Sequence, residues 1–334
     1  MVSDAAFAAL RAHRVDGRVE SRLETLVIAD LNPGDVSVCV AWSSLNYKDA
    51  LACTGAGRIQ KRFPLVGGID LAGHVAASRD PRFREGDAVL VIGCGLGEEA
   101  DGGYAGYANV CGDWLVPLPA GLTLREAMAI GTAGFTAALG IVRLEDNGQS
   151  PAHGPMLVSG ATGGVGSFAI DLLAGLGYEV AALTGKPDEH AYLQQLGATQ
   201  IVDRSTLDPG SRPLETARWG GAIDNLGGTT LAWLTRTIRP FGNIACIGLA
   251  QDHRLETSVM PLILRGISLI GINSTYCPSP WRARTWERLA ADLKPQHLAC
   301  IVTGELTLEA LPAACAALLG GRATGRSVVR IGGG

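Results

Sequence analysis

Two spacings of apolar residues divide the chain. In the first part, short apolar runs alternate with polar positions as in half-buried strands, for example from Val36 to Trp42, and glycine-rich turns separate them. From Leu124 onward the spacing changes toward a helical period, and strand-like runs then alternate with helical ones. We therefore predict a β-rich domain of barrel type followed by an α/β domain.

The α/β part contains six strand-like runs, most of them separated by helical stretches. This alternation predicts a doubly wound parallel sheet. The runs are Met156–Ser159, Glu179–Leu183, Gln200–Asp203, Gly221–Asn225, Asn243–Ile247 and Ser268–Ile272. After residue 275 we predict a charged helix at Trp281–Leu293, an alanine-rich helix at Leu308–Leu319 and a strand at Ser327–Ile331. That last strand has no obvious place in the parallel sheet, so we expect it to return to the first domain.

One stretch, residues 156–167, carries the strongest functional signal. An apolar strand enters a glycine turn and continues as a helical stretch, which is the arrangement that binds dinucleotides. Gly160 lets the chain leave the strand, and Gly166 lets the helix pack closely. We expect backbone N–H groups of this turn to bind a diphosphate, with contacts from Thr162, Gly163, Gly164, Val165 and Gly166. A structural turn without a ligand is the alternative.

The end of the second strand of such a sheet usually distinguishes NAD from NADP. An acidic residue there binds the ribose 2′-hydroxyl, whereas a basic residue accepts the 2′-phosphate. Here the strand ends in Thr184, Gly185 and Lys186 without a carboxylate, and Arg204 follows the third strand. We therefore predict NADPH as cofactor; the alternative is that Lys186 and Arg204 are solvated surface charges.

Composition excludes several other classes. The chain has 334 residues, 47% of them hydrophobic, and a net charge of −4, which gives no sign of nucleic-acid binding. None of the eight cysteines forms a Cys-x-x-Cys pair, so we expect reduced thiols in a cytoplasmic protein. The N-terminus has no signal-peptide pattern, and the longest uncharged runs are too short to span a membrane.

Several longer motifs resemble the medium-chain dehydrogenase/reductase superfamily, and within it the acryloyl-CoA reductase group of quinone-oxidoreductase-like proteins. They are residues 44–50, 68–73, 112–117, 129–137, 160–167, 259–265 and 325–326. The resemblance implies a GroES-like catalytic domain at residues 1–125 and 276–334, and a Rossmann NADPH-binding domain at 126–275. It also implies reduction of the C=C bond of a short enoyl-CoA, most simply acryloyl-CoA to propanoyl-CoA, by a protein that we expect to be a homodimer.

Zinc is not expected in this group. Zinc-using relatives have a cysteine where this chain has Asn46, and His-Glu where it has Ile69 and Asp70. An amide and an alkyl group replace a thiolate and an imidazole, so we predict a metal-free site.

The reaction requires hydride at the β-carbon, a proton at the α-carbon and hydrogen bonds to the intermediate enolate. Tyr47 is the first catalytic candidate, either as a donor or as a wall of the nicotinamide pocket. Asp70 is the second, either orienting Tyr47 or Lys48 or satisfying loop N–H groups. Further cofactor contacts expected from fold and family are Leu249, Ser274 and Arg326.

Two positions depart from the group's pattern. Cys94 and Asp101 stand where the group often has tryptophan, near the expected acyl pocket. A wider or altered pocket keeps two other functions open. One is reduction of quinones or free enones with NADPH, and the other is a catalytically idle NADPH-binding redox sensor.

Overall fold

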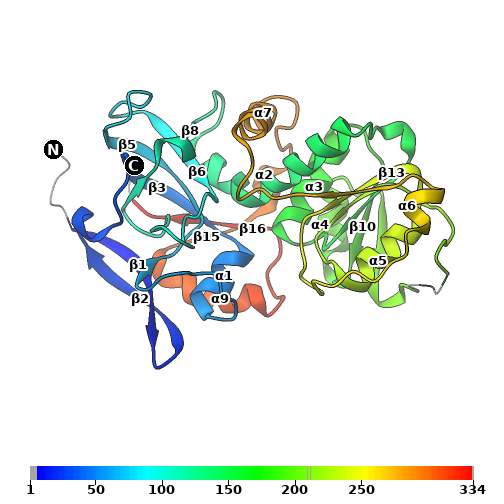
Figure 1. Ribbon diagram of the computed structural model, residues 1–334, viewed down its shortest axis with the longest axis horizontal. Helices are drawn as coiled ribbons and strands as arrows, with labels where there is room; N and C mark the ends of the chain where they lie inside the picture. The colour runs from blue at the N-terminus through cyan, green and yellow to red at the C-terminus, as the bar shows by residue number, and fades with distance from the viewer. Residues whose placement is uncertain (1–5, 209, 211, 333–334) are drawn as a thin grey trace. The chain divides into compact units, whose positions relative to one another are not determined.

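The computed structural model describes residues 6–208, 210 and 212–332, and the chain divides into two compact units (Figure 1). Met1–Thr132 and Val302–Gly334 form the first unit, and Ala133–Ile301 forms the second. The two ends of the chain therefore belong to one unit and its middle to the other.

The division differs from the predicted one mainly in residues 276–301, which we had assigned to the first domain and which lie in the second unit. Two contacts within that unit account for this. The ring of Trp286 lies 5.7 Å from that of Phe135, centroid to centroid, and His297 Nδ1 lies 2.7 Å from the buried Asp171 Oδ1. Residues 276–301 thus pack on the helices that contain Phe135 and Asp171, both in the second unit.

The first unit is β-rich, as predicted. A three-stranded sheet has the order β2-β1-β4, and a seven-stranded sheet has the order β15-β16-β3-β5-β6-β8 with β7 paired to β3. The strands are β1 (Phe7–Val15), β2 (Arg18–Leu26), β3 (Val36–Leu45), β4 (Leu65–Val66), β5 (Asp70–Ser78), β6 (Ala88–Ile92), β7 (Tyr107–Val110), β8 (Val116–Pro117), β15 (Val302–Leu306) and β16 (Arg326–Arg330). Strand β16 pairs antiparallel with β3, Ser327 opposite Leu45, so the last strand does return to the first unit.

Short helices complete this unit: α1 (Tyr47–Thr54), α9 (Leu311–Leu319), and the 3-10 turns η1 (Ile28–Asp30), η2 (Gly112–Trp114) and η6 (Leu308–Ala310). Helices α1 and α9 pack against each other, and Ala50, Leu311 and Cys315 share one buried core. The predicted helix from Leu308 is a 3-10 turn followed by α9, whose first turn contains Pro312.

The second unit contains the predicted doubly wound sheet. Its six strands are all parallel, in the order β11-β10-β9-β12-β13-β14, with the first strand in the middle of the sheet. They are β9 (Met156–Ser159), β10 (Val180–Thr184), β11 (Gln200–Asp203), β12 (Trp219–Asp224), β13 (Ile238–Cys246) and β14 (Ser268–Gly271). All six predicted strands are therefore confirmed, and β9 and β11 have the predicted bounds.

The helices of this unit are α3 (Gly164–Gly175), α4 (His190–Gln195), α5 (Gly228–Thr237), α6 (Met260–Leu264), α7 (Ser279–Leu289) and α8 (Leu298–Ile301), with the 3-10 turns η3 (Pro151–His153), η4 (Pro187–Glu189) and η5 (Arg204–Thr206). The predicted charged helix ends at Leu289 rather than Leu293. The Leu293 N–H turns back to donate to the Arg288 carbonyl at 2.8 Å, which closes the helix end.

Helix α2 (Leu124–Asp146) is interrupted by a non-helical residue, Gly131, with φ 46° and ψ −155°. Among the described residues it is the one helix long and apolar enough to cross a membrane, but 89% of that window is buried within the protein. Helix α2 is therefore buried to the extent expected of a helix in a protein core.

Candidate functional site

The glycine turn after β9 has the geometry that its sequence predicts. Gly160 adopts φ 58°, which only glycine takes readily. A Cβ on Gly166 would lie 2.3 Å from the Gly160 carbonyl oxygen, so helix α3 approaches the turn as closely as a glycine permits. A Cβ on Gly163 would meet only that oxygen, at 3.4 Å, and Gly163 is exposed.

The first turn of α3 supplies the anion-binding groups. Gly163 is the N-cap, so the N–H groups of Gly164, Val165 and Gly166 have no acceptor within the helix. Together with the helix dipole, these groups attract a diphosphate. Thr162, also predicted as a contact, is buried in the same turn.

A residue that the sequence analysis missed holds this turn in place. The Tyr192 hydroxyl, on α4, donates to Ser167 Oγ at 2.8 Å, and Ser167 Oγ donates to the Gly163 carbonyl at 2.9 Å. Burial raises the pKa of Tyr192 to about 12, so it stays a hydrogen-bond donor at neutral pH. No local pattern around residue 192 indicates this contact, because it joins two separate helices.

The predicted 2′-phosphate residues lie together. Strand β10 ends at Thr184, whose Oγ1 accepts from the Lys186 N–H at 3.0 Å. The Arg204 guanidinium lies against Gly185: a Cβ on that glycine would be 3.2 Å from Arg204 Nη2. The nearby Asp203 carboxylate already accepts from the Ser205 N–H and hydroxyl, both at 2.8 Å. Two basic side chains therefore flank the exposed Gly185 at the tip of β10.

A second residue missed in the sequence lies where the strand order of the sheet reverses, between β9 and β12. Asn225 Nδ2 donates to the Ser159 carbonyl at 2.7 Å, and the Asn225 N–H donates to Ser159 Oγ at 2.9 Å. Among the described residues, Asn225 Oδ1 is a buried oxygen without a partner. Ligands of such sheets bind at this position, so Asn225 is a candidate to accept a hydrogen bond from a bound nucleotide. A polar residue at the end of a predicted strand was the available signal.

Leu249 and Ser274 follow β13 and β14 at the same carboxyl edge of the sheet. Leu249 is 65% exposed, and Ser274 Oγ accepts from Thr136 Oγ1 at 2.8 Å. Both residues lie at the edge of the sheet where we expect cofactor contacts, and neither side chain is buried in the core.

In the first unit, Asp70 and Arg326 form a buried ion pair with an Oδ2–Nη2 distance of 3.2 Å. Both are almost fully inaccessible. Asp70 also accepts hydrogen bonds from Ser44 Oγ, Asn46 Nδ2 and both Thr132 donors. Its carboxylate is thus saturated with donors, and none of them belongs to Tyr47 or Lys48.

Arg326 is equally committed. Its five N–H groups donate to the Ala129 and Leu45 carbonyls, Asn46 Oδ1, Ser44 Oγ and Asp70 Oδ2, at 2.6–3.2 Å. Burial lowers its pKa, and the Asp70 charge opposes that effect. We expected Arg326 to contact the cofactor, and the structure gives its guanidinium five partners within the first unit. The local sequence of Arg326, a Gly-Arg pair before a strand, could not reveal this partner, because Asp70 lies 256 residues away in the chain.

Tyr47 is the first residue of α1, and 47% of its surface is exposed. The residues around it hold the helix end firmly. Asn46 is the N-cap, and the Asp49 carboxylate accepts from the Asn46 N–H and the Ile69 N–H, both at 2.9 Å. Burial, followed by the Asp70 charge, raises the pKa of Asp49 to about 7. Tyr47 is therefore partly exposed at the start of a firmly held helix, whereas Asp49 and Asp70 are buried.

The two departures from the group's pattern have different structural consequences. The buried Asp101 accepts from the Asn32 N–H and the Val66 N–H, both at 2.9 Å, and from Arg62 at 3.2 Å. Cys94 adopts φ 55° between two glycines that also have positive φ, an uncommon conformation for a side-chain-bearing residue. Asp101 thus anchors a loop through polar bonds.

The residues present do not fit a catalytic zinc. Asn46 is committed to Asp49, Asp70 and Arg326, and Ile69 has no ligand atom in its side chain. Within the described ranges no three His, Cys, Asp or Glu side chains gather as a metal site would require.

Comparison with known families gives two matches. The model described as "Alcohol dehydrogenase GroES-like domain" matches residues 32–120, and the model described as "Zinc-binding dehydrogenase" matches residues 164–291. The second match lies within the dinucleotide-binding unit, away from the positions at which zinc ligands would be expected.

Three proteins are similar over nearly the whole chain. "Acrylyl-CoA reductase AcuI" of Ruegeria pomeroyi is 46% identical, covering 94% of this chain and 96% of its own. The yhdH oxidoreductase of Salmonella enterica, solved in complex with NADP, is 47% identical with a TM-score of 0.95, covering 97% of this chain and 100% of its own. Bacillus subtilis YhfP, named a putative quinone oxidoreductase, is 46% identical over 97% of this chain and 99% of its own. Its structure with NAD bound has a TM-score of 0.95.

Proposed function

The chain belongs to the medium-chain dehydrogenase/reductase family, in its acrylyl-CoA reductase and quinone-oxidoreductase-like group, and from this premise we propose that it reduces the C=C bond of a short enoyl-CoA with NADPH. Acryloyl-CoA, reduced to propanoyl-CoA, is the proposed substrate. The observation that carries the proposal is the 46% identity to a protein named acrylyl-CoA reductase over 94% of this chain.

The choice of NADPH for this chain depends on its own residues, because one similar structure holds NADP and another holds NAD. The unpaired N–H groups at the start of α3 fit a diphosphate. Arg204 and Lys186 fit a 2′-phosphate beside Gly185, and the nearby Asp203 carboxylate is already hydrogen-bonded to Ser205. Asn225 Oδ1 supplies one further acceptor.

In the proposed reaction the bound cofactor supplies a hydride to the β-carbon of the enoyl thioester. The chain's own residues then have three tasks: to bind the nucleotide, to stabilise negative charge on the thioester oxygen, and to deliver a proton to the α-carbon. The Asp70 carboxylate is saturated and Arg326 fully bonded. We therefore assign the hydrogen bond to the enolate to Tyr47, which is 47% exposed.

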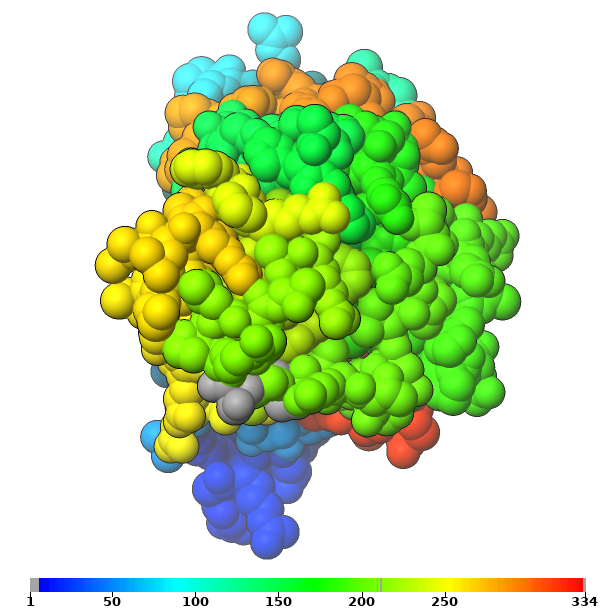
Figure 2. Space-filling view, turned by 90° about the vertical axis from the view of Figure 1, so that its right-hand side faces the viewer, coloured from blue at the N-terminus to red at the C-terminus, as the bar shows by residue number. Residues whose placement is uncertain are grey.

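We also propose a homodimer, formed along the edge of the second unit's sheet. Strand β14 is an edge strand, and the neighbouring segment exposes Val259, Met260, Ile263 and Leu264, which are 40–73% accessible. This segment, yellow to orange in Figure 2, lies at the surface of the unit. Exposed apolar side chains beside the open edge of a sheet are typical of an interface between proteins.

A cytoplasmic location accords with this assignment, because all eight cysteines are free thiols, as expected in a reducing compartment. Fractionation of the source cells would test it.

The first prediction concerns substrate choice. With NADPH, kcat/KM for acryloyl-CoA should exceed that for crotonyl-CoA by about tenfold or more, because a pocket fitted to the shorter chain rejects one extra methyl group to that extent. Benzoquinone and simple enones should be poorer still, since they lack the CoA moiety. Steady-state kinetics across these compounds measure the ranking. A quinone ranked first would establish the function suggested by the YhfP name, and NADPH binding without any turnover would indicate a redox sensor.

The second prediction concerns the cofactor. Arg204→Gln removes one charge-assisted contact to the 2′-phosphate, so kcat/KM with NADPH should fall about tenfold while kcat/KM with NADH stays the same. The matched control is Arg218→Gln, an exposed arginine before the amino end of β12. Equal losses with both nucleotides would show that Arg204 does not contact the phosphate.

The third prediction concerns the proton and the enolate. Tyr47→Phe should lower kcat for acryloyl-CoA about 100-fold, the usual effect of removing one donor to a developing oxyanion. NADPH affinity, followed by fluorescence titration, should change little because the ring remains. Tyr107→Phe is the control, because Tyr107 lies in β7 with its ring tilted against that of Phe7. An unchanged kcat would leave Tyr47 only the role of a pocket wall.

The fourth prediction concerns assembly. Sedimentation velocity should show a dimer that the Ile263→Asp variant converts to monomer, because the new charge would be buried in an apolar contact. Leu23→Asp, at an exposed leucine of the first unit, should leave the dimer intact. A monomeric wild-type protein would contradict the proposed interface.

A further inference from the structure

Asp49 is a buried carboxylate to which the proposed reaction assigns no task. It lies in the first turn of α1 and is only 2% exposed. Its Oδ1 accepts from the Ile69 N–H at 2.9 Å, and its Oδ2 accepts from the Asn46 N–H at 2.9 Å and from Asn46 Nδ2 at 3.0 Å. One side chain thus joins the start of α1 to the residue that precedes β5.

These bonds hold the backbone that leads into Tyr47. Asn46 is the N-cap of α1, Tyr47 is the first helical residue, and Asp49 is the third. An acid at the third position that accepts from the N-cap N–H satisfies a donor that has no acceptor within the helix. Its negative charge also interacts favourably with the amino end of the helix. The conformation at Tyr47 therefore depends on the Asp49 carboxylate.

Asp49 belongs to a buried cluster in which negative charge exceeds positive charge. Asn46 Nδ2 also donates to Asp70 Oδ2 at 2.9 Å, and Asn46 Oδ1 accepts from Arg326 Nη1 at 2.8 Å. A single amide therefore joins two carboxylates and one guanidinium, and the guanidinium forms its ion pair with Asp70. A buried charge without a partner is costly, and a proton on the carboxyl group removes that cost.

The other ionisable groups near this carboxylate add no positive charge to the cluster. Three of them are acids that are neutral when protonated and negative when ionised, namely Tyr104, Cys53 and Cys315. The ammonium of Lys48, the preceding residue of α1, forms an ion pair with Glu98 at 2.8 Å. The cluster therefore keeps its excess of negative charge until the carboxylate takes up a proton.

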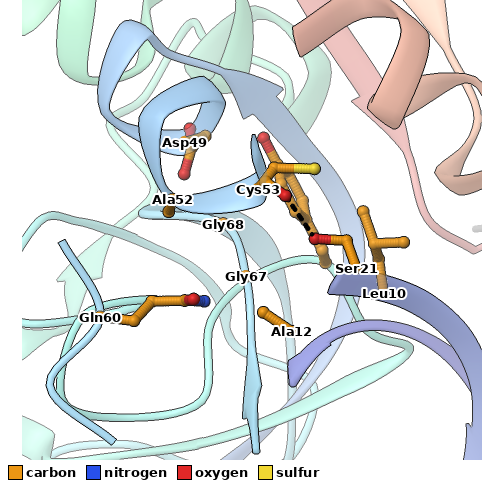
Figure 3. A pocket seen from close by; sticks show the side chains of 10 residues that line it. Leu10, Ala12, Ser21, Asp49, Ala52, Cys53, Gln60, Gly67 and Gly68 are labelled. Carbon is orange, nitrogen blue, oxygen red and sulfur yellow. Dashed lines mark hydrogen bonds between the residues drawn. The ribbon is translucent and has the colours of Figure 1, made fainter. Parts of the chain in front are cut away.

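A small cavity borders the carboxylate (Figure 3). Its volume is about 10 Å³, and Asp49 and Gln60 are among the residues that line it. Strands β1 and β2 contribute Leu10, Ala12 and Ser21, which carry no charge. Within the described part of the chain, Gln60 Oε1 is buried without a hydrogen-bond partner, so one water would fit the cavity by size and by chemistry. Proton exchange at Asp49 therefore does not require α1 to unfold.

The surroundings of Asp49 bring its ionisation close to neutral pH. Burial, and then the charge of Asp70, raises the pKa of Asp49 to about 7, while the hydrogen bonds from Asn46 and Ile69 oppose the effect. A neutral carboxyl group holds N–H donors less strongly than a carboxylate does, and its O–H oxygen becomes a donor itself. Protonation of Asp49 therefore loosens the start of α1.

We propose that Asp49 is a positioning residue for Tyr47: its ionised carboxylate holds the first turn of α1 in the conformation in which Tyr47 meets the substrate, and protonation releases that turn. The inference rests on the proposed function, because Tyr47 is the donor to the enolate there. Asp49 itself touches neither substrate nor cofactor and acts through the backbone of Asn46. Activity is therefore lost toward acid pH, whereas a tyrosine that acts as an acid loses activity toward alkaline pH.

The first test is the pH profile of kcat for acryloyl-CoA with NADPH. In the wild type, kcat should fall about tenfold from about pH 8 to about pH 6, because a group with a pKa of about 7 takes up its proton over this range. Asp49→Asn keeps the shape without the charge, so its kcat should be about tenfold below that of the wild type at the alkaline end and should not fall further. A wild-type kcat that does not change over this range would overturn the proposal, whether or not the variant folds.

A double-mutant cycle tests whether Asp49 acts through Tyr47. Asp49→Asn should lower kcat about tenfold in the wild type but only about twofold or less in Tyr47→Phe, because the hydroxyl that it positions is already absent. NADPH affinity and KM for acryloyl-CoA should stay within about twofold, since neither ligand contacts Asp49. A carboxylate that only stabilises the fold would reduce kcat by the same factor in both backgrounds, and that result would refute the positioning role.

Asp30→Asn is the matched control. Asp30 accepts from the Val27 N–H at 2.9 Å in a similar turn, but it is exposed, so this variant should keep the wild-type kcat and pH profile. Failure of the proposed function would look different. A wild type that does not reduce acryloyl-CoA at any pH, or a Tyr47→Phe variant with unchanged kcat, would overturn both proposals. A loss of kcat in Tyr47→Phe together with a flat wild-type profile would overturn the role of Asp49 alone.

Discussion

The buried pair of Asp70 and Arg326 is the interaction on which the first unit depends. Removing two charges from water costs several kcal/mol per ion, and only good geometry with additional hydrogen bonds offsets that cost. Here every N–H of Arg326 and both oxygens of Asp70 are bonded. These bonds join β3, β5, β16 and the start of α2 at one point. The loss of either partner would therefore leave an uncompensated charge at the junction of four elements.

The same pair explains an otherwise puzzling interruption of a long helix. Gly131 has a backbone conformation that side chains rarely adopt, and a Cβ there would lie 2.3 Å from Arg326 Nη2 and 2.7 Å from Asp70 Oδ2. The helix yields at Gly131, so that the Thr132 N–H can donate to Asp70 at 2.9 Å. One glycine thus combines a positive φ with close approach to an ion pair, and the kink in α2 follows from the electrostatics of its neighbours.

Local patterns predicted much of the second unit and little of this pair. Strands β9 and β11 and the glycine turn after β9 are set by neighbours in the sequence, so spacing and residue type were sufficient to predict them. Arg326 and Asp70 meet through tertiary folding, and the short motifs around them contain no trace of the partner. The place of residues 276–301 in the second unit could not be predicted locally either, because Trp286 and His297 contact Phe135 and Asp171, which are distant in the sequence. Asn225 ended a predicted strand, but its unpaired oxygen became visible only when Ser159 was placed beside it.

The polar groups of the protein thus fall into two kinds. Asp70, Arg326 and Asn46 are bonded within the chain at every polar side-chain atom, and they form a buried scaffold. Within the described part of the chain, Asn225 Oδ1 and Gln60 Oε1 are buried without a hydrogen-bond partner, and the first N–H groups of α3 have no acceptor within the helix. Helix α1 begins at this scaffold: Asn46 and Asp49 fix its first turn, while Tyr47 stays half exposed.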